Sequence, residues 1–167
     1  PRSVTNDADM FGFYIYNNVS IAFRTFEGGI LAGIGSLFIL LHNALFMGVV
    51  SGHIINIDYS STFFPFIIAH SSFELTAIVI SAQAGLICGW SLFYRRGLSA
   101  RSSLRRAAKR ALPLVAGAGL MLVLAAAIEA FWSSRHELPL LLRYLSGAGC
   151  WLVLILWLGL GGRRHQS

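Results

Sequence analysis

The sequence predicts an all-α integral membrane protein, and three observations lead to this fold class. Of the 167 residues, 56% are hydrophobic and only 12% are charged, whereas about 25% of the residues in soluble domains are charged. A membrane-spanning helix needs about 20 mostly apolar residues, and four segments have this length: residues 30–55, 66–94, 113–132 and 138–160. The strands of a membrane barrel would alternate apolar and polar residues over about ten positions, and the sequence has no such period. We therefore expect a single transmembrane domain, residues 1–167, built as a bundle of about four transmembrane helices.

The start of the sequence and its cysteines add little chemistry. The sequence begins at Pro1 without Met and lacks the basic, apolar and small-residue regions of a signal peptide, so we expect it to be part of a longer chain. Cys88 and Cys150 lie within apolar segments and have neither a metal-binding spacing nor a disulfide framework. We expect both to be packing residues.

The first expected element is an amphipathic helix over residues 10–26. Its apolar side chains recur at intervals of three and four residues, with Asn18 as the polar exception on that face; they are Phe11, Tyr14, Ile15, Val19, Ala22 and Phe26. A helix with one apolar stripe buries that stripe among lipid headgroups and keeps its polar face wet. We expect this helix to lie in the membrane surface.

Pairs of small residues occur in or next to the first two spans. They are Gly29/Gly33, Gly48/Gly52 and Gly85/Gly89, each four residues apart. Small residues at this interval let helices approach closely in lipid. We expect a compact bundle and self-association as a homodimer or homo-oligomer.

Charge orients the bundle, because Lys and Arg near span ends accumulate on the cytoplasmic side. The loop between the second and third spans carries Arg95, Arg96, Arg101, Arg105, Arg106, Lys109 and Arg110. The loop over residues 56–64 has no basic residue, the turn over residues 133–137 has only Arg135, and Arg163 and Arg164 follow the fourth span. The pattern predicts that the basic loop and both ends of this segment are cytoplasmic.

The basic loop also has the pattern of a second amphipathic helix, over residues 99–112. Its apolar side is formed by Leu104, Ala107, Ala108 and Ala111, and we expect Arg101, Arg105, Arg106, Lys109 and Arg110 to contact anionic lipid at the membrane surface. The alternative is a solvated basic loop without a partner. Pro113 suits the first turn of the helix that follows. The net charge of +6 follows from this topology, so we expect no nucleic-acid binding.

Ionisable residues inside the second span are the strongest indication of function. An acidic side chain at mid-membrane costs about 2.5–3.5 kcal/mol and therefore usually faces protein or a polar cavity. His70 and Glu74 are one turn apart on the small or polar side of the span, opposite Leu75 and Val79. Glu129, near the outer end of the third span, lies in the same leaflet. Asn43 and His42 of the first span are candidates for the same inner layer, and we predict a functional polar cluster of His70, Glu74, Glu129 and Asn43.

Motifs that extend from residue 17 to residue 131 resemble the stage II sporulation protein M family. They are Asn17-Asn18 before a helix that ends at Phe26, the Gly-rich start of the first span, Asn43 followed by Gly48, His70-x-x-x-Glu74-Leu75, Ala84-Gly85, and Glu129-Ala130-Phe131. Family members often have Pro-His-Gly where this chain has Ala69-His70-Ser71, and Asn-Gly where it has Asn43-Ala44. Pro65 supplies a backbone break one turn earlier.

The resemblance implies a multi-pass protein of the bacterial or archaeal cytoplasmic (inner) membrane. In endospore formers the family member is a scaffold that associates with peptidoglycan-degrading partners during engulfment. His70, Glu74 and Glu129 match family positions, but the resemblance implies no role for them.

Three functional hypotheses follow. We favour a membrane scaffold for cell-envelope or peptidoglycan-remodelling partners, with no catalytic residue and no cofactor. The second is an ion- or proton-coupled transporter or sensor in which Glu74 and Glu129 change protonation and His70 relays charge; the lack of an inverted repeat weighs against it. The third is an intramembrane metal-dependent hydrolase, with a metal ion held by His70, Glu74 and Glu129, or by His42 as the third ligand.

Overall fold

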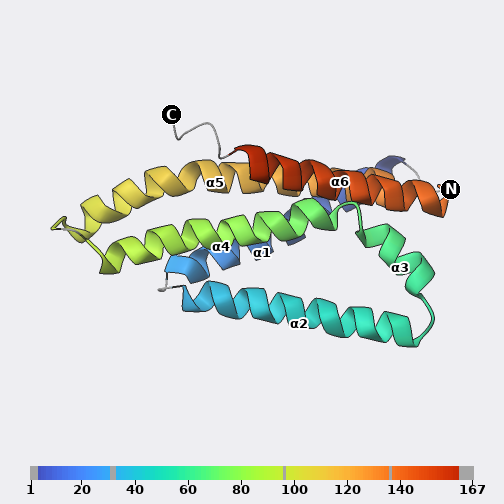
Figure 1. Cartoon of the computed structure of the whole chain (residues 1–167), viewed down its shortest axis with the longest axis horizontal. Helices are drawn as coiled ribbons and strands as arrows, with labels where there is room; N and C mark the ends of the chain where they lie inside the picture. Colours follow the sequence, from blue (N-terminus) through green and yellow to red (C-terminus); the bar gives the residue numbers. More distant parts are fainter. Residues whose placement is uncertain (1–3, 31–32, 96, 136, 162–167) are drawn as a thin grey trace.

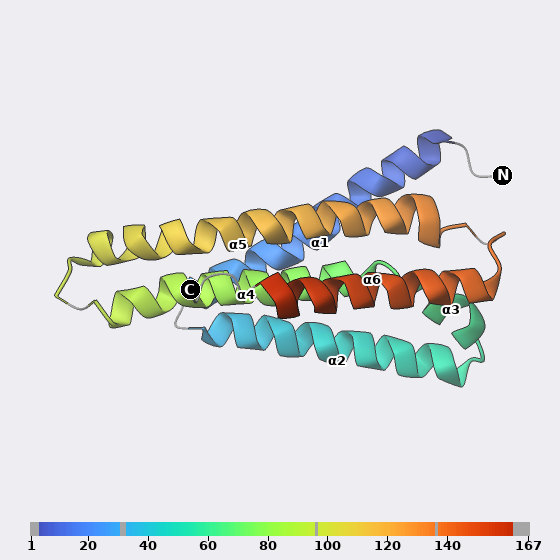
Figure 2. The same ribbon diagram turned by 45° about the horizontal axis from the view of Figure 1, so that its top comes forward.

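The computed structural model describes residues 4–30, 33–95, 97–135 and 137–161, and every regular element in these ranges is helical. The elements are α1 (Val4–Ile30), α2 (Ile34–Asn56), α3 (Ser60–Ile67), α4 (Ser71–Phe93), α5 (Ala100–Ile128), the π-helix η1 (Glu129–Ser133) and α6 (Leu140–Gly161). Figures 1 and 2 show one elongated bundle in which α4 and α5 form a long hairpin, α1 crosses the hairpin, and α6 lies along it. The structure confirms the predicted all-α membrane bundle.

Four helices are long and apolar enough to cross a membrane: α2, α4, α5 together with η1, and α6. The second span begins at Ser71 instead of residue 66, because α3 and a turn over residues 68–70 precede it. Pro65 lies inside α3, so the break in the helix follows the proline by three residues. This break places His70 directly before the first turn of α4.

Helix α1 is longer than the amphipathic helix expected over residues 10–26, and it packs along the bundle. It runs parallel to α4: Ala22 shares a core cluster with Ala77, and further along both helices Gly29 lies against Gly85. The helix therefore follows α4 through the depth of a candidate span, whereas the sequence pattern indicates a helix in the membrane surface. Its first turn lies at the end of the bundle where α4 begins, opposite the α4–α5 turn (Figures 1 and 2).

Glycine allows α1 and α4 to touch through their backbones. A Cβ on Gly29 would lie 2.6 Å from the Cα of Gly85, and a Cβ on Gly89 would overlap the carbonyl oxygen of Gly29. Gly33 directly precedes α2 and has a φ of +83°, a backbone conformation that glycine adopts readily. A Cβ on Gly48 or on Gly52 of α2 would meet nothing within 4 Å. The structure thus uses the glycines of α1 and α4 for packing within the chain and leaves those of the middle of α2 exposed.

The predicted amphipathic helix over residues 99–112 and the third span form one continuous helix, α5, with Pro113 inside it. Ser99 caps this helix, because its Oγ accepts a hydrogen bond of 3.3 Å from the backbone N–H of Ser102. A proline removes one donor from the helix, and membrane helices tolerate this loss where neighbouring groups compensate. The hydroxyl of Ser103 donates to the carbonyl of Ser91 at 2.6 Å and so joins α5 to α4.

Helix α4 has one face toward protein and one away from it, as its sequence pattern predicts. The small residues Ala77, Ala84 and Gly85 are buried. The exposed face is formed by Leu75, Val79, Leu86, Trp90 and Phe93, which are 44–70% exposed. Glu74, in the first turn of α4, lies on the side of this helix that is directed toward η1.

Candidate functional site

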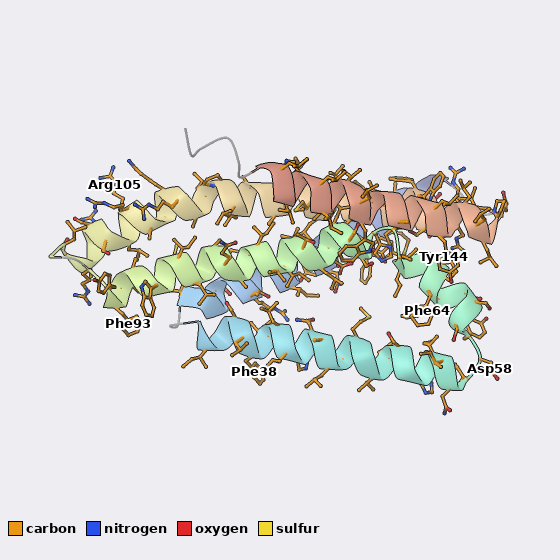
Figure 3. All side chains as sticks on the ribbon, viewed as in Figure 1. Phe38, Asp58, Phe64, Phe93, Arg105 and Tyr144 are labelled. Atoms are coloured by element: carbon orange, nitrogen blue, oxygen red, sulfur yellow. The ribbon has the colours of Figure 1, made fainter. Side chains whose placement is uncertain are left out.

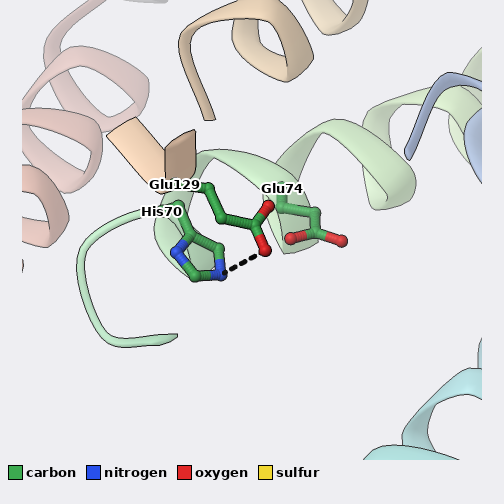
Figure 4. A group of neighbouring side chains, drawn as sticks. All are labelled: His70, Glu74 and Glu129. Carbon is green, nitrogen blue, oxygen red and sulfur yellow. Dashed lines mark ion pairs between the residues drawn. The ribbon is translucent and has the colours of Figure 1, made fainter. Parts of the chain in front are cut away.

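His70, Glu74 and Glu129 meet at the end of the bundle where α4 begins. Each offers one ligand atom, and these atoms lie within 4.8 Å of one another. The Nε2 atom of His70 is 3.9 Å from Oε1 of Glu129, close enough for an ion pair but too long for a hydrogen bond. Figure 4 shows the imidazole and both carboxyl groups side by side, contributed by the turn before α4, by α4 and by η1.

The cluster is buried in the bundle. His70 is 5% exposed and Glu129 is 9% exposed, and Glu74 is half-buried. The ring of Phe66, in α3, stands edge-on to the imidazole with the ring centroids 5.4 Å apart. An apolar wall of this kind keeps water from the imidazole and strengthens electrostatic interactions within the cluster.

The π-helix η1 supplies both Glu129 and a second contact to His70. The Oγ of Ser133, the last residue of η1, lies 3.3 Å from Nδ1 of His70. π-helical turns are rare and occur frequently at functional sites. When Ser133 accepts a hydrogen bond from Nδ1–H, the lone pair of Nε2 faces Glu129, and a ring fixed in this way is typical of a metal-binding histidine.

Helix α6 adds a buried cation to the surroundings of the site. Arg143 is 5% exposed, and its Nη2 donates a hydrogen bond of 2.7 Å to the backbone carbonyl of Ser133. Its Nε is buried without a hydrogen-bond partner. The sequence analysis identified neither Ser133 nor Arg143 as part of the site. Arg143 could have been found, because a basic residue within a predicted span often marks a functional site.

The donor set suits a divalent transition metal. One imidazole nitrogen and two carboxylate oxygens are ligands that Zn²⁺ takes in proteins, and three protein ligands leave a fourth position for water. A tetrahedral Zn²⁺ with bonds of about 2.0–2.1 Å needs ligand atoms ~3.4 Å apart, whereas the His70–Glu129 pair is 3.9 Å apart. All three donor atoms lie within 4.8 Å of one another, so a tetrahedral ion would require them to move closer together.

The other predicted site residues lie elsewhere. The side-chain amide of Asn43 donates to the carbonyl of Ile39 on its own helix at 2.9 Å. His42 is exposed and its ring lies 6.3 Å from that of Phe38. The structure therefore brings together His70 and the two glutamates, and it does not bring α2 to them. The basic residues predicted to contact lipid are all exposed and lie in the first half of α5: Arg101, Arg105, Arg106, Lys109 and Arg110.

The chain was compared with known proteins and protein families. Searches against curated proteins and against solved structures found no match. The profile of the family described as Stage II sporulation protein M matches residues 2–134, a range that contains His70, Glu74, Glu129 and Ser133. Because this match covers most of the sequence, the chain belongs to the stage II sporulation protein M family.

Proposed function

We propose that this protein is a scaffold of the cytoplasmic membrane whose outer end is held in one shape by a divalent cation bound to His70, Glu74 and Glu129. One observation carries the proposal: the ligand atoms of the three side chains lie within 4.8 Å of one another where the α3–α4 turn, α4 and η1 meet. The cation is the organising group, and partner proteins dock on the surface that it shapes.

Charge balance favours a cation over mutual pairing of the three side chains. Hydrogen bonds between membrane helices contribute only about 0.6–2 kcal/mol each, which does not offset the burial of two carboxylates. A divalent cation neutralises both carboxylates at once and is the largest charge in such a site. Arg143 does not fill this role, because within the described residues the one ion pair of the cluster joins His70 and Glu129.

The position of the cluster supports a scaffold role. It links the α3–α4 turn to η1, and Ser133 continues the link to Arg143 of α6. These segments form the end of the bundle opposite the basic α4–α5 turn (Figure 1). With the basic turn in the cytoplasm, this end faces the cell envelope, where family members in endospore formers associate with peptidoglycan-degrading partners. In this proposed orientation the first turn of α1 lies on the outer side, whereas the charge pattern alone leads us to expect both ends of this segment on the cytoplasmic side.

A second candidate function is metal-dependent hydrolysis. The observation in its favour is the number of protein ligands, because three ligands leave room for a metal-bound water that can act as a nucleophile. A structural cation and a catalytic one bind the same residues. They differ in whether metal exchange changes a reaction rate or only the stability of the outer end.

The cation is tested by elemental analysis of protein purified in detergent. We expect about one bound transition metal per chain in the wild type and almost none in Glu129→Gln or His70→Gln. The matched controls are Glu137→Gln and His53→Gln, which change exposed residues of the same types and should keep the metal. A metal-free wild type, or equal loss in the controls, would rule out the site.

The scaffold role is tested by photo-crosslinking in cells. A photoreactive amino acid at Tyr59, which is 58% exposed beside α3, should crosslink an envelope protein in the wild type but not in the Glu129→Gln background. The same probe at Phe93, at the opposite end of α4 and 70% exposed, should give no product that depends on Glu129. Crosslinks at Tyr59 that persist in Glu129→Gln would separate partner binding from the cation and contradict the proposal.

A further inference from the structure

A basic groove runs between the second half of α4 and the first half of α5. It encloses a cavity of about 560 Å³ with Leu86, Ile87 and Trp90 of α4 on one wall and Arg106 and Arg110 of α5 on the other. Arg95 lies at its end, in the turn that follows α4. The hydrogen bond from Ser103 to Ser91 holds the two walls together.

The arginines of this groove form no ion pair within the described residues. The sequence from Gln83 to Arg110 contains no Asp or Glu, and the described residues give no ion pair to any arginine. Arg106 and Arg110 are one helical turn apart, so their guanidinium groups can approach one anionic group together. The groove therefore presents arginines without an ion-paired acid beside an apolar wall.

The groove lies at the level of the membrane surface. The side chain of Leu86 reaches the start of α2, since a Cβ on Gly33 would overlap it. Helix α4 continues to Phe93, about 10 Å beyond this level at 1.5 Å per residue. The hairpin thus protrudes past the start of α2 (Figure 1), and Figure 3 shows Phe93 and Arg105 at this protruding end. Trp90, 68% exposed, has the position of an interfacial aromatic residue.

A second, apolar cavity adjoins the groove at Leu86. It has a volume of about 350 Å³, lies between the start of α2 and α4, and shares Leu86 with the basic cavity. Its remaining wall is largely apolar, with Ile34, Leu37 and Leu40 on α2 and Ala82 on α4. A charged cavity that adjoins an apolar one matches a molecule with an anionic head and a hydrocarbon tail.

We propose that these adjoining cavities bind one anionic phospholipid. Its phosphate lies between Arg106 and Arg110, Arg95 contacts the rest of the headgroup, and one acyl chain occupies the cavity between α2 and α4. The neighbouring residues Arg101 and Arg105 line neither cavity. The proposal therefore assigns lipid binding to Arg106 and Arg110 and not to every basic residue of α5. The lipid site is independent of the cation proposed at the other end of the bundle.

Native mass spectrometry of the detergent-purified chain, with equal amounts of phosphatidylglycerol and phosphatidylcholine added, tests this site. The wild type should retain one phosphatidylglycerol per chain in preference to phosphatidylcholine. Arg106→Gln/Arg110→Gln should lower this occupancy at least fivefold, while Arg101→Gln/Arg105→Gln, an equal change of charge five residues earlier in α5, should leave it unchanged.

Two further samples test the fit of the whole lipid. Leu40→Trp, which fills the apolar cavity without altering charge, should also lower phosphatidylglycerol occupancy. Glycerol 3-phosphate, which has the head without the tails, should not be retained. The proposal is overturned by equal retention of both lipids, by equal loss in the two double variants, or by retention of glycerol 3-phosphate at the level of the lipid.

Discussion

The contact between α1 and α4 makes a quantitative prediction for Gly29→Ala. A Cβ on Gly29 would lie 2.6 Å from the Cα of Gly85, whereas two carbon atoms in contact need about 3.5 Å. The neighbouring atoms belong to the backbone of α4, so no side chain can rotate away, and the two helices must separate by about 1 Å locally. Overpacking of this kind costs about 2 kcal/mol, which corresponds to a decrease in melting temperature of ~4–8 °C for a chain of this size.

The assay is the melting temperature of the detergent-purified protein, measured as loss of the folded peak in size-exclusion chromatography after heating. The matched control is Gly48→Ala, because a Cβ on Gly48 would meet nothing within 4 Å. Alanine favours a helix over glycine by up to about 1 kcal/mol, so this control should melt at or slightly above the wild-type temperature. Equal melting temperatures for Gly29→Ala and Gly48→Ala would show that α1 does not contact α4 through its backbone.

Three further predictions concern the site and self-association. Ser133→Ala should weaken metal binding by about 10–100-fold, because the imidazole ring of His70 is no longer held in place. The control is Ser134→Ala, which should not weaken metal binding, because the hydroxyl of Ser134 donates to the carbonyl of Ala130. Equal affinities of the two variants in a metal titration would exclude the orienting role of Ser133. Glu74→Gln should abolish complementation of a deletion strain, and Val79→Ala on the exposed face should complement it fully; the reverse order would remove the cluster from the function. The sequence predicts self-association, and of its three glycine pairs only Gly48/Gly52 has no contact within the chain. Gly52→Ile should therefore lower the dimer fraction in single-molecule photobleaching, and an unchanged fraction would place the interface elsewhere.

The fold class and the spans were within reach of the sequence because they depend on the length of apolar runs. The α4 face pattern was also readable, since its small residues and its large apolar residues alternate with helical period. The break before Ser71 was only partly predictable. Pro65 marks the region, but the turn falls at residues 68–70, where the packing of α3 and α4 decides it.

The cluster was predictable in part for a different reason. His70 and Glu74 share a helix face by spacing alone, and Glu129 follows from its depth in the third span. Asn43 has a similar depth, but its helix contacts the bundle mainly through its first turns, and its amide bonds its own backbone. No sequence pattern marks the π-helix that presents Ser133, because one extra residue in a helical turn is a tertiary effect.

The position of α1 shows the limit of amphipathic patterns. A stripe of apolar residues fits a membrane surface and a neighbouring helix equally well. The glycines at the end of α1 distinguish the two, since Gly28 packs against Gly35 and Gly29 against Gly85. Gly29 and Gly85 lie far apart in the sequence, so their contact is visible only in the folded chain.

The most direct test of the proposed cation site is X-ray absorption spectroscopy at the metal edge of the purified wild-type protein. The account predicts one metal per chain with one imidazole nitrogen and two carboxylate oxygens at about 2.0–2.2 Å, and almost no absorption at the metal edge in His70→Gln. A spectrum without bound metal, or one with sulfur ligands from Cys88 or Cys150, would contradict the assignment of His70, Glu74 and Glu129 as a cation site.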